Sequence, residues 1–100
     1  MAKKQVKYSP SLFSGQDDKY CFVCGSTQYV QRHEIFFGAY RNKSKEYGLW
    51  LNLCSSCHDK THFAKDHSLD IKLKQLGQAK FEETHTREEF MSLFGKNRLE

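Results

Sequence analysis

The chain has 100 residues, of which 38% are apolar and 28% charged, a composition too apolar for an intrinsically disordered protein and ordinary for a soluble globular domain. The formal net charge of +4 is mild and does not by itself distinguish a solvated surface from a nucleic-acid partner. We see no signal peptide and no stretch long and apolar enough to cross a membrane, so we expect one cytoplasmic domain with a modest core.

The first half of the chain predicts an arm, a strand and a short helix. Residues 1–19 contain the only proline, Pro10, together with serines, a glycine and two aspartates, which predicts a mostly irregular arm. The β-prone stretch 29–37 predicts a strand. The polar residues 41–47 predict a short helix, which Gly48 ends.

The second half predicts one more strand and three helices. Leucines at alternate positions predict a strand over 49–53 with one buried face. Helices are expected over 55–65 and 69–84. A last helix begins at the capping-box pattern of Thr86 and ends at Gly95. The expected core contacts of these last two helices are Leu69, Leu73, Leu76, Phe90, Leu93 and Phe94.

Two Cys-x-x-Cys pairs, Cys21/Cys24 and Cys54/Cys57, stand 29 residues apart. In a cytosolic chain such pairs bind metal more often than they form disulfides, and four thiolates suit a closed, structural zinc. A small core needs such a supplement, since structural zinc contributes roughly 10–16 kcal/mol of apparent folding free energy. We therefore predict one structural Zn²⁺ held by all four cysteines.

Three of the five histidines, His33, His58 and His62, are candidates for a second metal site. His58 and His62 are four residues apart on the predicted helix and share one face, with Cβ atoms roughly 6 Å apart. With His33 on the first strand they suit a second ion, and three imidazoles leave a coordination position open for substrate or water. Two alternatives stay open. A lone histidine on a strand is more often structural, and His58 could replace Cys57 in the zinc site.

The residues around these ligands resemble a known family. The segment RHEIF at 32–36 and the segment LCSSCH at 53–58, followed by His62, are similar to the HNH endonucleases with their ββα-metal core. The subgroup that the chain resembles is the small phage and prophage HNH proteins pinned by a four-cysteine zinc. The match covers 21–63 well, and residues 73–97 resemble tails that follow the core in such proteins.

This resemblance implies a catalytic site and a substrate. His33, His58 and His62 would bind one divalent cation, Mg²⁺, Mn²⁺, Ni²⁺ or Zn²⁺, which polarises the scissile phosphate and stabilises the leaving 3′-oxygen. Cleavage of DNA would leave 5′-phosphate and 3′-hydroxyl ends, with little sequence specificity because phosphate contacts position a duplex without reading it. The residues expected to contact the DNA backbone are Arg32, Arg41, Lys43 and Lys45.

Glu34 departs from the family pattern, which has a histidine as general base at this position. Glutamate is a weaker base, with a reference pKa of about 4.3 against about 6.5. A positioned base contributes roughly 10²- to 10⁴-fold, so the exchange could slow or disable the enzyme. Alternatively, His33 is the base and Glu34 reaches the metal, or Glu34 is a surface carboxylate paired with Arg32. We expect Glu34, His33 and His58 to carry the catalysis.

The asparagine that orients the base in the family is also displaced. Its position falls near Leu49, which cannot form the hydrogen bond, and either Asn52 or Asn42 could substitute. His67 and His85 are expected to lie outside the site.

These observations predict an α+β fold, with a zinc-pinned ββα-metal core over 20–66 and a C-terminal helical segment over 67–98 that packs on it. The expected function is a metal-dependent DNA endonuclease or nicking enzyme, encoded by a phage or prophage and acting in the bacterial host cytoplasm. Phage packaging proteins are possible partners. The rival hypotheses are a non-catalytic DNA-binding zinc module and a zinc-stabilised module that docks on a phage assembly.

Overall fold

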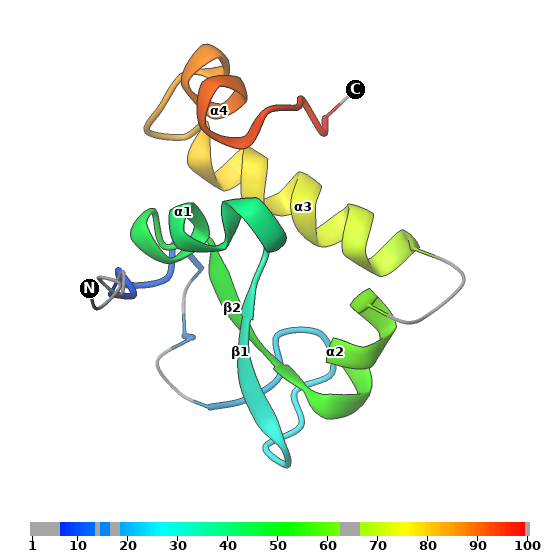
Figure 1. The fold of residues 1–100 in the computed structure, drawn as a ribbon. Coiled ribbons are helices and arrows are strands. Elements are labelled where there is room, and N and C mark those ends of the chain that lie inside the picture. Colours follow the sequence, from blue (N-terminus) through cyan, green and yellow to red (C-terminus); the bar gives the residue numbers. More distant parts are fainter. Residues whose placement is uncertain (1–6, 14, 17–18, 63–66, 100) are drawn as a thin grey trace, which may run out of the picture.

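Two antiparallel strands, β1 (Val30–Glu34) and β2 (Trp50–Cys54), lie at the centre of the molecule (Figure 1). The computed structural model describes residues 7–13, 15–16, 19–62 and 67–99. The register pairs His33 with Leu51 and Glu34 with Trp50. The α+β prediction is confirmed, because within the described residues this two-stranded sheet is combined with four α-helices.

The helices lie close to where the sequence predicted them. A 3₁₀ turn, η1 (Gly38–Tyr40), and helix α1 (Arg41–Glu46) connect the two strands. Helix α2 (Ser55–His62) follows β2 directly, and α3 (Ser68–Phe81) and α4 (Arg87–Phe94) complete the fold. Residues 63–65 of the predicted second helix lie outside the described residues. No helix in the described part of the chain is both long enough and apolar enough to span a bilayer.

The predicted boundaries of α4 are confirmed by its caps. The Thr86 hydroxyl accepts from the Glu89 backbone N–H at 3.1 Å, and the Glu89 carboxylate accepts from the Thr86 backbone N–H at 3.4 Å, which is a capping box. Gly95 ends the helix in the left-handed conformation, with φ +77°.

The N-terminal arm is irregular in its described residues, as predicted, but it packs along β2. The Trp50 Nε1–H donates to the Ser9 carbonyl at 2.7 Å, and the Asn52 backbone N–H donates to Gln16 Oε1 at 2.8 Å. The expectation that only one face of this strand is buried is therefore wrong. Trp50 and Asn52, on the face opposite the leucines, are only 2% and 4% exposed because the arm covers them.

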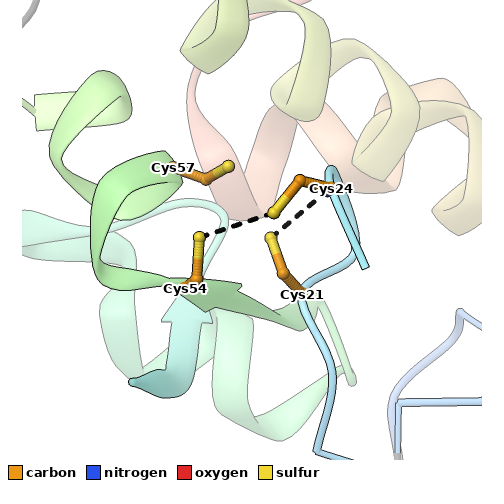
Figure 2. Close-up of side chains that lie close together, drawn as sticks. All are labelled: Cys21, Cys24, Cys54 and Cys57. Carbon is orange, nitrogen blue, oxygen red and sulfur yellow. Dashed lines mark hydrogen bonds between the residues drawn. The ribbon is translucent and has the colours of Figure 1, made fainter. Parts of the chain in front are cut away.

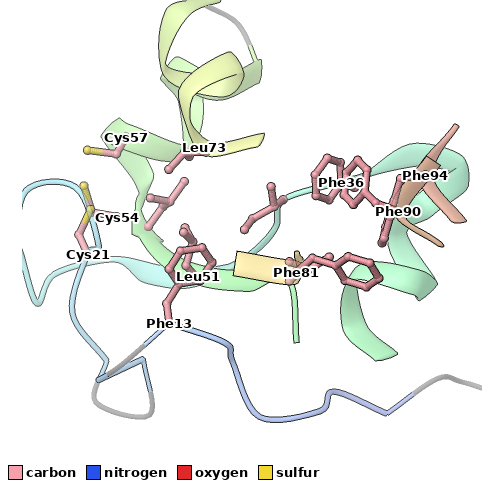
Figure 3. Packing of buried hydrophobic residues seen from close by; sticks show 13 residues of the cluster. Phe13, Cys21, Phe36, Leu51, Cys54, Cys57, Leu73, Phe81, Phe90 and Phe94 are labelled. Atoms are coloured by element: carbon pink, nitrogen blue, oxygen red, sulfur yellow. The ribbon is translucent and has the colours of Figure 1, made fainter. Parts of the chain in front are cut away.

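The core extends from the cysteines at one end to a group of phenylalanines at the other (Figure 3). The phenylalanine end comprises Phe36, Phe81, Phe90 and Phe94. Of the predicted contacts on α3, Leu73 is buried but Leu76 is 38% exposed, so that expectation is wrong. The buried stripe instead continues through Gly77, where an added Cβ would lie 3.2 Å from the Phe36 ring. The missing side chain lets α3 approach Ile35 and Phe36, which directly follow β1.

Candidate functional site

The four cysteines converge on one point, with their sulfurs within 4.8 Å of one another (Figure 2). Cys21 and Cys24 come from the loop before β1, Cys54 ends β2, and Cys57 lies in the first turn of α2. The Cys24 and Cys54 sulfurs are 3.6 Å apart, whereas a disulfide bond is about 2.05 Å long. Two thiolates on one tetrahedral zinc, each at about 2.3 Å, lie about 3.8 Å apart. This cluster could therefore hold a structural metal ion.

The electrostatics of the cluster also fit a cation. Burial opposes ionisation of the Cys21 thiol, but backbone N–H groups of Cys24, Cys54 and Val23 outweigh it and lower its pKa to about 6. Burial, followed by hydrogen bonds from the other three sulfurs, raises the pKa of Cys57 to about 12. The Cys21 thiolate thus forms readily, whereas ionisation of the Cys57 thiol is unfavourable in the absence of a cation. A divalent cation at the centre of the cluster would favour ionisation of Cys57 as well.

The three histidines form a second cluster beside the sheet. His33 lies on β1, and His58 and His62 lie one turn apart on α2. The Nε2 atoms of His58 and His62 are 3.2 Å apart, and the His33 ring centroid is 5.1 Å from that of His58 and 5.5 Å from that of His62. One ligand nitrogen from each residue lies within 4.8 Å of the others. Two imidazoles on one tetrahedral zinc, each at about 2.0 Å, would be about 3.3 Å apart, so the observed spacing fits one ion.

His33 carries the clearest sign of a missing partner. Its Nε2 atom is buried and makes no hydrogen bond to the described residues. Burial, followed by the charges of His58, His62 and Lys74, lowers the pKa of His33 to about 3, so this imidazole is neutral at pH 7. Burial also lowers the pKa of His58. Neutral imidazoles are the form that coordinates a metal, and a buried, unpaired ring nitrogen costs free energy unless something binds it.

The histidines open into a surface pocket of about 240 Å³. Its lining comprises Arg32, His33, Glu34, Phe37, Arg41, His58 and His62. The pocket thus combines three imidazoles, one carboxylate and two guanidinium groups. That composition suits an anionic ligand held beside a cation.

Glu34 interacts with residues from two other segments of the chain. One carboxylate oxygen lies 3.7 Å from Arg41 Nε. Glu34 also interacts with Tyr8, whose pKa is raised by burial first and then by the charge of Glu34 and a hydrogen bond with it. Arg32, the partner considered from the sequence, instead stacks its guanidinium over the rings of Tyr8 and Trp50 at 4.5 and 4.4 Å. The carboxylate is thus oriented by residues from the arm and from α1.

The four predicted DNA contacts do not gather in one place. Arg32 and Arg41 line the histidine pocket. Lys43 donates to the Leu93 carbonyl at 2.8 Å and so binds the end of α4. The Lys45 ammonium lies 5.2 Å from the Tyr8 ring. Both lysines therefore also have internal contacts.

The asparagine candidates lie away from the pocket lining. Leu49 is fully buried in the core. Asn52 donates from its side chain to the Gln16 carbonyl at 2.7 Å and holds the arm, while Asn42 is exposed on α1. His67 is exposed just before α3 and His85 stacks on a phenylalanine, and neither lines the pocket.

Two residues of the site were missed by the sequence reasoning. Phe37, considered only as part of a strand, lines the pocket with its ring centroid 4.8 Å from that of His62. Tyr8 lies in the arm, far along the chain from Glu34. No spacing or motif connects either residue to the histidines.

No protein-family model, curated protein or solved structure matches the chain. The two clusters and the pocket between β1 and α2 are therefore the features from which a function is inferred.

Proposed function

We propose that the protein is a metal-dependent endonuclease of the HNH type that hydrolyses phosphodiester bonds in DNA. The observation that carries the proposal is the convergence of three imidazoles, one carboxylate and two guanidinium groups at one open pocket. Phosphodiester hydrolysis needs a cation for the phosphate, a base for water and positive charge for the flanking backbone. Each of these needs has a candidate residue in the pocket.

His33, His58 and His62 would hold the cation. When bound there, a divalent ion polarises the scissile phosphate and stabilises the leaving oxygen. An all-imidazole donor set favours Zn²⁺ or Ni²⁺ over Mg²⁺ and Mn²⁺, which prefer oxygen ligands. The buried, unpaired Nε2 of His33 supports a ligand role for this residue rather than a role as base.

Glu34 would then accept the proton of the attacking water. Its contacts with Arg41 and Tyr8 orient the carboxylate, a task that the family gives to an asparagine. The exposed guanidinium of Arg41 and that of Arg32 would bind phosphate oxygens on either side of the scissile bond. The four-cysteine site would hold the loop before β1 against α2, which keeps His33 opposite the two helical histidines.

A second candidate is a non-catalytic DNA-binding module. It is favoured by one observation, the ion pair of Glu34 with Arg41, because a base already engaged by a guanidinium is less free to take a proton. A role in phage DNA processing or packaging follows from the resemblance alone.

The test is nicking of supercoiled plasmid by purified protein with Mg²⁺, Mn²⁺, Ni²⁺ or Zn²⁺, compared with His58→Ala and with His67→Ala as the matched control. We expect nicking by the wild type and by His67→Ala, and a loss of at least about 100-fold in His58→Ala. Products should carry 5′-phosphate ends, which a ligase can reseal. Binding of the plasmid without nicking under every metal would refute the endonuclease and favour the binding module.

A further inference from the structure

A second basic pocket of about 210 Å³ lies between α3 and the segment that follows α4. Its lining comprises Ile71, Lys74, Gln75, Lys96, Asn97 and Arg98. Three of these side chains are cationic and none is a carboxylate. We call it the C-terminal pocket. One wall of this pocket is the segment 96–98 after α4, which we call the tail and for which the sequence predicted no function.

The tail is held in place by a buried glutamine on α3. Gln78 is 0% exposed, its Nε2 donates to Asn97 Oδ1 at 2.8 Å, and its Oε1 accepts from the Arg98 backbone N–H at 2.6 Å. Gln75 Nε2 adds a bond to the Arg98 carbonyl at 3.1 Å. Burying a polar side chain costs free energy unless its hydrogen bonds are made, so these contacts hold the tail in one conformation. Lys96 and Arg98 then line the same pocket as Lys74.

This arrangement leaves positive charge unbalanced. Lys74 is paired with Asp70 at 2.8 Å, but Lys96 and Arg98 have no acidic partner among the described residues. Arg98 Nε is buried and makes no hydrogen bond to that part of the chain. Cations held close together repel one another, and an anion with several acceptor oxygens would relieve both the repulsion and the unpaired donor.

The C-terminal pocket adjoins the histidine pocket through one aromatic ring. The Lys74 ammonium lies 4.1 Å from the Phe37 ring centroid, and that centroid lies 4.8 Å from the His62 ring centroid. Lys74 lines the C-terminal pocket and Phe37 lines the histidine pocket. A DNA strand with one phosphate at the histidine pocket would therefore pass close to the C-terminal pocket, which could hold another phosphate of the same strand.

We propose that the C-terminal pocket binds a backbone phosphate of the DNA, on the strand held at the histidine site. This inference rests on the proposed function. Lys96, Arg98 and Lys74 would hold the phosphate oxygens and so fix the register of the strand on the enzyme. Arginine suits this task because its planar fork matches the geometry of phosphate oxygens. The contact positions DNA and reads no sequence.

The test compares Lys96→Gln/Arg98→Gln with Lys72→Gln/Lys80→Gln, which removes the same charge from α3 outside the C-terminal pocket. Lys74 is left unchanged because it balances Asp70. Affinity for a short labelled duplex is measured over a range of salt concentrations without added divalent metal. Loss of one phosphate contact should reduce the slope of log K against log[salt] by about 0.9 and weaken binding roughly three- to tenfold at 0.1 M salt. The control pair should keep the wild-type slope.

Equal slopes for the two double variants would overturn the proposal. A second outcome would also overturn it. If NMR shows saturable binding of inorganic phosphate to the wild type while Lys96→Gln/Arg98→Gln keeps the wild-type salt slope for the duplex, the pocket serves a free phosphate. The Gln78 anchor uses only the Arg98 backbone, so the double variant should fold. If its melting temperature falls, Lys96→Gln alone provides the test, because that side chain is exposed.

Nicking separates this proposal from the proposed function. A wild type that binds the duplex with the expected slopes but never nicks would refute the endonuclease and support the pocket. If the wild type nicks DNA but both double variants keep the wild-type salt slope, the endonuclease is supported and the phosphate-binding role of the C-terminal pocket is refuted.

Discussion

The Nε2 atoms of His58 and His62 lie 3.2 Å apart, one turn apart on the same helix, and His33 completes the set from the neighbouring strand. In the metal-free protein, two ring nitrogens at this distance would form a hydrogen bond, with one donating its N–H to the other. On a common ion they would be two of three ligands, and the unpaired His33 Nε2 would be the third.

We therefore predict two metal ions per folded chain when zinc is supplied. His62→Ala should retain one ion and the fold, because the cysteine cluster is untouched, and should lose metal-dependent nicking. Metal content is measured by mass spectrometry after gel filtration. His67→Ala serves as the matched control and should retain two ions, since His67 lies outside the pocket lining. One ion in the wild type and in His62→Ala alike would contradict the second site.

Glu34→Gln should slow nicking by roughly 10²- to 10⁴-fold, because the amide cannot accept the proton of the attacking water. Glu34→His should raise the rate above that of the wild type, since imidazole is the stronger base. Both are measured as initial rates on supercoiled plasmid with metal in excess. Unchanged nicking in Glu34→Gln would transfer the role of base to His33.

The contact between Tyr8 and Glu34 can be tested without activity. Burial and then Glu34 raise the pKa of Tyr8, so the fold favours the neutral phenol. The stabilisation is fully present below about pH 10, the ordinary value, and is lost as the pH rises through the raised pKa. Glu34→Gln should lower the Tyr8 pKa, measured by NMR titration of ring carbons. An unchanged titration would show that the two side chains do not interact.

Removing the cysteine-held metal should unfold the protein. Structural zinc contributes roughly 10–16 kcal/mol, while a domain of this size is stable by only about 5–15 kcal/mol in total. Cys57→Ser is therefore expected to lose helical circular dichroism and to bind no zinc at this site. A folded, zinc-free Cys57→Ser protein would show that the core alone holds the fold.

Gly48→Ala should destabilise the fold by about 2 kcal/mol or more. Gly48 has φ +71°, and a Cβ there would meet the carbonyl oxygen of Pro10 in the arm. Gly38→Ala is the control, with φ +66° and no atom within 4 Å of the added Cβ, so it tests backbone strain alone. Denaturant unfolding compares the two variants. Equal losses would mean that the arm moves aside without cost.

Much of the fold follows from local patterns. The positions of α3 and α4 and the capping box at Thr86 were predicted because helix periodicity and caps depend on residues a few positions apart. The burial of Trp50 and Asn52 was not, because it depends on an arm about forty residues earlier in the chain whose composition indicates only a loop. Leu76 was misjudged because Gly77, with no side chain to signal burial, makes the closest contact.

The sequence by itself predicted the candidate ligands, since Cys-x-x-Cys spacing and two histidines one helical turn apart bring the donor atoms within each pair together through local geometry. The meeting of the two cysteine pairs, and of His33 with the helical histidines, depends on the tertiary structure. Only the tertiary structure decided what surrounds them. Phe37 against His62, Tyr8 beside Glu34, and Lys74 between the two pockets are contacts between segments distant in the chain. No local pattern records such contacts, because they depend on how the arm and α3 pack against the hairpin.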